Sequence, residues 1–114
     1  RDETITIVQN AILDKLSQDD DFRDCIITSK FTDPSGGEIT LNDRNECFTY
    51  FPELKQKINS LVPPRFDSEV KVCEITAQSP CGSTQTITKN VYTKDTLVAS
   101  SDTQIIIRVY LWEK

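Results

Sequence analysis

The chain has 114 residues, a formal net charge of -5 at pH 7 and no histidine. This length suits a single domain. Histidine is the usual general acid or base near neutral pH, so Ser-His, Cys-His and His-metal sites are excluded. The 18 acidic residues against 13 basic ones disfavour a nucleic-acid partner, because the chain would repel a phosphate backbone. We therefore expect one domain that is not an enzyme.

Four cysteines are spread along the chain without a CxxC pair: Cys25, Cys47, Cys73 and Cys81. With no histidine to share a zinc site, disulfides fit better than a metal. We predict two sequence-near bridges, Cys25 with Cys47 and Cys73 with Cys81, although four cysteines allow three pairings. Disulfides form in oxidising compartments, so we expect an extracytoplasmic domain, extracellular or at the cell surface.

Helical spacing is clear at the start of the chain. Arg1 to Leu16 reads as an amphipathic helix that ends near Ser17, and apolar residues recur on one face: Ile5, Val8, Ala11, Ile12 and Leu16. A second apolar pair, Ile7 and Leu13, widens this stripe. We therefore expect the helix to lie against a sheet.

An acidic run follows this helix and is the only candidate cation site. Its members are Asp19, Asp20, Asp21 and Asp24. Calcium needs several oxygen ligands on one loop, but the central glycine and closing glutamate of an EF-hand are absent. We interpret the run as a solvated helix end and expect no metal. The residues that follow, Phe22 to Ile27, fit either a further helical turn or a short strand.

Turn residues dominate the next segment. The stretch 32–37 contains proline, serine and two glycines, and it lacks the lysine of a phosphate-binding loop. Alternation in 38–41 predicts a short strand at a sheet edge, with Ile39 and Leu41 on one face.

A second helix is predicted from Phe51 to Leu61. Its apolar stripe is Leu54, Ile58 and Leu61. Pro52 suits a first helical turn, and Pro63 and Pro64 end the helix.

Three later segments alternate with a period of two, which predicts strands at 68–76, 84–93 and 103–113. The last is apolar on both faces, as is typical of a central strand. One face carries Ile105, Ile107, Val109 and Leu111, and the other carries Ile106, Arg108, Tyr110 and Trp112. We expect the first face to pack on the N-terminal helix. Helices first and strands last predict an α+β fold in which this helix covers a C-terminal antiparallel β-sheet.

Two aromatic groups are candidate contact surfaces. Phe48, Tyr50 and Phe51 follow Cys47, while Tyr110 and Trp112 share one face of the last strand. Such residues occur in interfaces but more often belong to the core. We favour the core and keep four residues as candidates for an interaction surface: Phe48, Tyr50, Tyr110 and Trp112. No motif assigns a catalytic residue, a cofactor or a particular pair of carboxylates.

Several features resemble the ectodomains of type IV pilin-like proteins, particularly archaeal forms. They are a helix that begins at residue 1, Pro64-Arg65-Phe66 leading into Val70-Lys71-Val72-Cys73, the strand Asn90-Val91-Tyr92, and the closing run 107–114. The resemblance covers mainly the second half of the chain. It implies an apolar N-terminal helix, upstream of Arg1, that anchors the protein in a membrane and packs into a filament.

The leading hypothesis is therefore the ectodomain of a membrane-anchored pilin-like subunit. Its partners would be other protein subunits of a surface assembly, the head itself would be monomeric, and it would meet the membrane only through a segment absent from this chain. The alternative is a small secreted, disulfide-stabilised binding or effector protein, and an enzyme that uses carboxylates alone comes third. An apolar helix of about 20 residues upstream would favour the anchored subunit, and a cleaved signal peptide the secreted protein.

Overall fold

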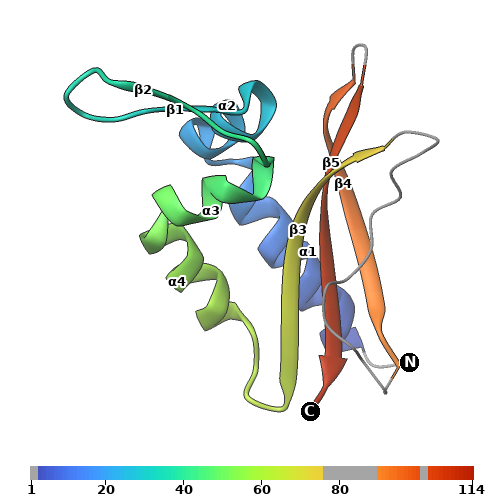
Figure 1. Cartoon of the computed structure of the whole chain (residues 1–114). Helices are drawn as coiled ribbons and strands as arrows, with labels where there is room; N and C mark the ends of the chain where they lie inside the picture. The colour runs from blue at the N-terminus through green and yellow to red at the C-terminus, as the bar shows by residue number, and fades with distance from the viewer. Residues whose placement is uncertain (1–2, 76–89, 101–102) are drawn as a thin grey trace.

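The computed structural model describes residues 3–75, 90–100 and 103–114 and has the predicted α+β architecture (Figure 1). Helices cover one face of a three-stranded antiparallel sheet, and a small hairpin projects from one end. The helices are α1 Glu3–Ser17, α2 Asp20–Thr28, the 3₁₀ turn η1 Arg44–Glu46, α3 Cys47–Tyr50 and α4 Pro52–Leu61. The strands are β1 Lys30–Thr32, β2 Glu38–Thr40, β3 Phe66–Ile75, β4 Tyr92–Ser100 and β5 Gln104–Glu113.

The last strand is the centre of the sheet, as predicted. The strand order is β3-β5-β4, and both neighbours of β5 run antiparallel to it. Its first face is buried in the main hydrophobic cluster through Ile105, Ile107, Val109 and Leu111. On the opposite face Ile106, Tyr110 and Trp112 are buried too. The two-sided apolar pattern of the sequence therefore corresponds to a strand that is covered on both sides.

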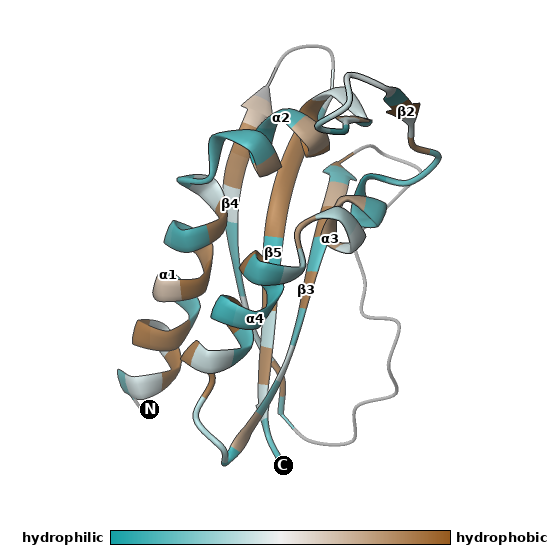
Figure 2. Ribbon diagram, turned by 90° about the vertical axis from the view of Figure 1, so that its left-hand side faces the viewer, coloured by the Kyte–Doolittle hydropathy of each residue, from teal (hydrophilic) through white to brown (hydrophobic). Residues whose placement is uncertain are grey.

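Helix α1 supplies most of the cover on the first face (Figure 2). The predicted stripe of Ile5, Val8, Ile12 and Leu16 is buried in the same cluster as β5. The prediction for the second apolar pair was only half right. Leu13 is buried, but Ile7 is 64% exposed, because it falls on the side of the helix that faces away from the sheet.

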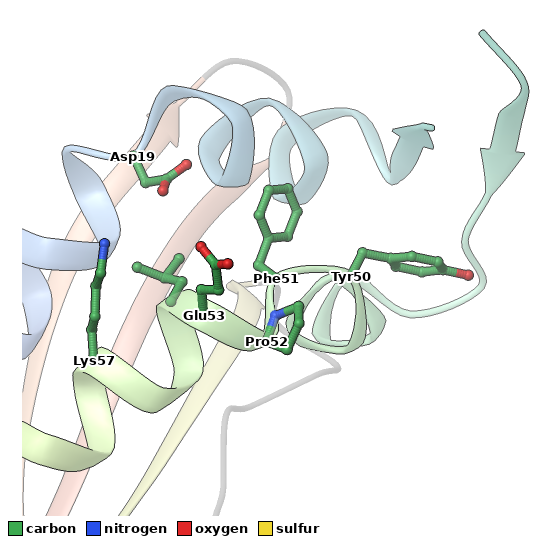
Figure 3. Close-up of a pocket in the computed structure, with 7 residues that line it drawn as sticks. Asp19, Tyr50, Phe51, Pro52, Glu53 and Lys57 are labelled. Carbon is green, nitrogen blue, oxygen red and sulfur yellow. The ribbon is translucent and has the colours of Figure 1, made fainter. Parts of the chain in front are cut away.

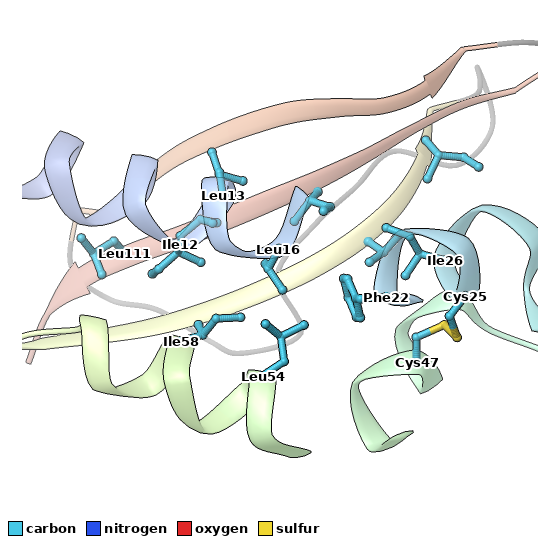
Figure 4. Close-up of a cluster of buried hydrophobic side chains, with 14 of the residues drawn as sticks. Ile12, Leu13, Leu16, Phe22, Cys25, Ile26, Cys47, Leu54, Ile58 and Leu111 are labelled. Carbon is cyan, nitrogen blue, oxygen red and sulfur yellow. A yellow bond between two sulfur atoms is a disulfide. The ribbon is translucent and has the colours of Figure 1, made fainter. Parts of the chain in front are cut away.

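The undecided segment after α1 is a helix, α2. Asp19 caps it: its Oδ1 accepts a hydrogen bond of 2.9 Å from the backbone N–H of Phe22. Such a cap satisfies one of the helix's free amide groups and typically contributes about 1 kcal/mol. Phe22, Cys25 and Ile26 point into the core (Figure 4). Asp19, Asp20 and Asp21 thus form the N-terminal end of a helix, and Asp24 lies in its middle.

The hairpin β1–β2 extends the predicted short strand. Strand β2 pairs with β1, which the sequence did not predict, and Ile39 lies opposite Phe31. Ile39 is largely exposed whereas Leu41, just after the strand, is buried. The two residues were expected to share one environment. The strand ends before Leu41, so they do not.

Helix α4 matches its prediction closely. Pro52 occupies the first turn, and Leu54 and Ile58 contact the core (Figure 4). Leu61, at the last turn, is largely exposed.

The strand predicted at 84–93 can be compared with the structure only at its end, because residues 84–89 lie outside the described part of the chain. Residues 90 and 91 are not in a strand, and β4 runs from Tyr92 to Ser100, further along the chain than predicted. A register shift between Leu97 and Ala99 interrupts its alternation. Several residues that face the helices, such as Lys94 and Thr96, are polar, which hides the strand from a search for apolar periodicity.

Side chains close part of both sheet edges. Asn45 binds the outer edge of β3 as a strand would: its Oδ1 accepts from the N–H of Val72 and its Nδ2 donates to the Val72 carbonyl, both at 2.8 Å. On β4, the buried Gln9 donates to the carbonyl of Tyr92 and Arg23 to that of Val98. Unpaired strand edges are sites of unwanted pairing, so these three side chains protect the sheet.

One predicted disulfide is confirmed. Cys25 on α2 and Cys47 on α3 are bonded, with their Cα atoms 6.1 Å apart. Two bridges were predicted. Among the described residues, Cys25–Cys47 is the one bridge of which both partners are described. Cys73 on β3 is also held in a disulfide, but its predicted partner, Cys81, lies outside the described part of the chain. The bridge that is present indicates an oxidising compartment.

Among the described helices, none is long and apolar enough to cross a membrane.

The central strand generates a stability prediction. Ile107 is fully buried between β3, β4 and α1, so Ile107→Ala should lower the free energy of unfolding by about 2 to 5 kcal/mol through lost burial and a cavity. Chemical denaturation measures this. Leu97→Ala on β4 is the control, since Leu97 is 56% exposed and its loss should be within about 0.5 kcal/mol. A loss below about 1 kcal/mol for Ile107→Ala would contradict the central role of β5.

Candidate functional site

An aromatic cluster lies at the end of the domain that carries the hairpin. We use this name for Phe22, Phe31, Phe48, Tyr50 and Phe51. Phe22, fully buried, packs its ring 5.0 Å from that of Phe48, centroid to centroid, and meets Phe51 edge to face. Phe31 stacks on Tyr50 with centroids 4.4 Å apart, and it also meets Phe51 edge to face. The rings thus form one continuous contact from the core to the surface.

The Cys25–Cys47 bridge fixes the frame of this cluster. It joins α2, which carries Phe22, to α3, which carries Phe48 and Tyr50. The loop that it closes contains the hairpin and therefore Phe31. Arg44 reinforces the junction, since its Nη1 donates to the carbonyls of Ile26 and Ile27 near the end of α2. The relative position of the rings is consequently set before any partner binds.

A shallow groove of about 290 Å³ lies beside the cluster (Figure 3). Tyr50 and Phe51 form its aromatic side, Pro52 and Leu54 continue it, and its charged residues are Asp19, Glu53 and Lys57. Figure 3 shows the Glu53 and Lys57 side chains rising from α4 toward Asp19. The groove lies where α2 and α4 begin, because Asp19 is the N-cap of α2 and Glu53 belongs to the first turn of α4.

The four predicted contact residues fall at two separate places. Phe48 and Tyr50 belong to the aromatic cluster and are half-buried. Tyr110 and Trp112 lie on β5, on the sheet face away from α1, and are only 5% and 8% exposed. The fold does not bring the two pairs together. Sequence reasoning missed Phe31, the ring that stacks on Tyr50, because nothing in the alternation around it distinguishes it from an ordinary strand residue.

The sheet face that carries Tyr110 also holds an ion pair across two strands. Arg108 donates from Nε and Nη2 to the two carboxylate oxygens of Asp95, at 2.6 and 2.9 Å. The hydrogen bond to Asp95 is the main reason that the pKa of Arg108 is raised above its usual value, and a contact with Tyr110 acts in the same direction. This partly exposed pair ties β4 to β5 on the sheet face away from the helices.

The acidic residues do not gather into a metal site. Asp20, Asp21 and Asp24 are exposed along α2 and Asp19 is occupied as its cap. In the part of the chain that the structure describes, no three acidic or cysteine side chains are arranged to hold an ion.

The turn between β1 and β2 is organised by one carboxylate. Asp33 Oδ1 accepts hydrogen bonds from the hydroxyl and N–H of Ser35 and from the N–H of Gly37, at 2.6 to 3.0 Å. Gly36 follows with a φ of 94°, a backbone conformation that glycine adopts without strain. The predicted turn at 32–37 is therefore correct, and Asp33 supplies its geometry.

Comparison of the chain with protein-family models, with curated proteins and with solved structures gave no match.

The disulfide generates the first prediction for this end of the molecule. Replacing both Cys25 and Cys47 by alanine should lower the free energy of unfolding by about 2 to 4 kcal/mol. Without the bridge, the unfolded chain regains the conformational entropy of the loop between the two cysteines, which are 22 residues apart in the sequence. Thermal unfolding of the double variant beside the parent measures the loss. Unchanged stability would show that the aromatic cluster holds α2 and α3 together without the bridge.

The second prediction for this end of the molecule concerns the pKa of Asp33. The Ser35 hydroxyl and the amide groups of Ser35 and Gly37 stabilise the charged carboxylate, so the pKa of Asp33 lies below its ordinary value of 3.8. Because the folded-state pKa is depressed, the turn is stabilised by this group above the unfolded pKa and loses that contribution as the pH falls through the folded pKa. NMR titration of the side-chain carboxyl measures the shift, and Ser35→Ala should return the pKa toward 3.8. An identical titration in both proteins would contradict the assigned cause.

Proposed function

We propose that the chain is the head domain of a membrane-anchored, pilin-like structural subunit that is exported to the cell surface and is not an enzyme. The observation that carries the proposal is the packing of α1 against the sheet. From Ile5 to Leu16 its apolar face is part of the main core, together with the central strand β5. A helix held in this way attaches the whole domain rigidly to anything that precedes it.

The direction of α1 supports the same proposal. The helix runs alongside the sheet, and its N-terminal end lies at the opposite end of the domain from the hairpin (Figures 1 and 2). A helix continued upstream would leave the domain past the end of the sheet without disturbing the core. The heads of such subunits would then stand away from the membrane, with the aromatic cluster at their outer end.

The disulfide supports the proposed export. Cys25 and Cys47 are both buried and bonded to each other, an arrangement that forms under oxidising conditions. A cell-surface location is the simplest such environment for a subunit of an external assembly.

One observation favours a second candidate, a secreted binding protein. The aromatic cluster and the adjoining groove place half-buried rings beside charged side chains at a fixed position, which suits recognition of another protein. In that case α1 would be only the core helix of the domain.

The native protein separates the two candidates. Antibodies raised against the domain should recover a longer chain from the membrane or filament fraction, and mass spectrometry of its N-terminal peptides should show an apolar segment continuous with α1. The segment should be about 20 residues long, enough to span a bilayer.

The culture medium is the second fraction to analyse. A mature chain recovered there, beginning at or near Arg1 after removal of a signal peptide, would refute the anchored subunit and leave the secreted binder.

A further inference from the structure

We propose that the groove beside the aromatic cluster binds an arginine side chain on an exposed segment of a protein partner. The proposal goes beyond the structural role above and does not depend on it. Its elements are the size of the groove, the chemistry of its lining, its charge and its rigidity.

The size of the groove favours one or two side chains. Its volume of about 290 Å³ lies at the lower end of the range of pockets that enclose small molecules, and it is shallow. A side chain presented by a partner fits such a site, because the rest of the partner contacts the rim.

The chemistry of the lining suits a guanidinium group. Asp19 and Glu53 supply carboxylates, and the Phe51 ring lies next to Glu53 (Figure 3). Tyr50 also lines the groove, but its ring points away from the two carboxylates. Arginine is the side chain that pairs with carboxylates through a planar fork of donors and also stacks on aromatic rings. Among the residues that the structure describes, Glu53 makes no ion pair, and the Asp19 carboxylate has one hydrogen bond, to the backbone.

The local charge is negative despite two opposing contributions. Lys57 is the one cation among the described residues of the lining, and the N-terminal ends of α2 and α4 each add about half a positive charge. Against these stand Asp19, Glu53 and the exposed carboxylates at the start of α2, Asp20 and Asp21. The two carboxylates of the lining balance about two positive charges, and Asp20 and Asp21, just outside the lining, make the surroundings of the groove negative. The surroundings of the groove therefore attract a cation.

The groove is also formed before binding. Its two walls belong to the start of α2 and to the junction of α3 and α4, and the disulfide joins α2 to α3 behind it. Phe51, in the wall, is held edge to face by Phe22 and Phe31. A pre-formed site loses little conformational entropy on binding, which is what a contact of one side chain requires.

The experiment uses acetyl-arginine N-methylamide as the probe and titrates it into the ¹⁵N-labelled domain, followed by NMR. We expect saturable shifts confined to the amides around Asp19, Tyr50 and Glu53, with a dissociation constant in the millimolar range. Acetyl-citrulline N-methylamide has nearly the same shape without the charge, and it should bind at least about tenfold more weakly.

Three variants test the site itself. Asp19→Asn keeps a residue that caps helices and removes the charge, and Glu53→Gln removes the charge from an exposed side chain. Each should weaken binding about two- to fivefold, the range of an exposed ion pair. Asp14→Asn on the exposed side of α1 changes the net charge equally and should have no effect.

Four outcomes would overturn the proposal. The first is no saturable shift with the arginine probe, and the second is equal binding of citrulline. The third is equal weakening by Asp14→Asn, because binding would then follow the general field of the protein. Inorganic phosphate that shifts the same amides, in place of the arginine probe, would likewise assign the groove to anions through Lys57 and the helix N-termini.

Discussion

The whole domain depends on one strand that has no hydrophilic side. Strand β5 buries Ile107, Val109 and Leu111 completely on the face toward the helices, and Tyr110 and Trp112 are buried on the other. A strand of this kind is stable only between two neighbours and under a layer on each face. Helix α1 is the main part of one layer, which explains why the first and last segments of the chain lie side by side.

A second, smaller constraint acts where the helices meet the hairpin. Here Phe22 is the inner member of a series of rings that reaches the surface at Tyr50, and the Cys25–Cys47 bridge crosses the same region. The two devices stabilise differently: the rings gain from burial in the folded state, whereas the bridge acts mainly by restricting the unfolded chain. The short elements α3 and β1 are not long enough to be stable alone. They hold their positions because the packed rings and the disulfide act together.

Sequence periodicity predicted the elements whose apolar residues face one common core. The stripes of α1 and α4 and the two faces of β5 belong to this class. The pairing of Cys25 with Cys47 was predicted separately, because the two cysteines are near each other in the sequence. Periodicity failed at β4, where a register shift breaks the alternation and Lys94 and Thr96 replace apolar residues. It also gave no sign that Asn45 binds the edge of β3 as a strand would, since this contact depends on the tertiary fold, which places the Asn45 side chain beside Val72. The candidate site was half predicted: Phe48 and Tyr50 were named, but Phe31 and the groove arise only from the tertiary fold.

The positions of the polar contacts limit how this domain can meet another protein. Asn45 occupies the outer edge of β3 at Val72, and Gln9 and Arg23 bind carbonyls of β4, so pairing with a further strand would have to displace hydrogen bonds already made. Displacing them carries the cost of leaving part-buried groups unsatisfied, which is about 1 to 3 kcal/mol for each. A partner that binds at the aromatic cluster would not have to displace these hydrogen bonds, because the outer rings and the neighbouring carboxylates are already accessible. A contact through side chains at the hairpin end would therefore displace fewer existing hydrogen bonds than extension of the sheet.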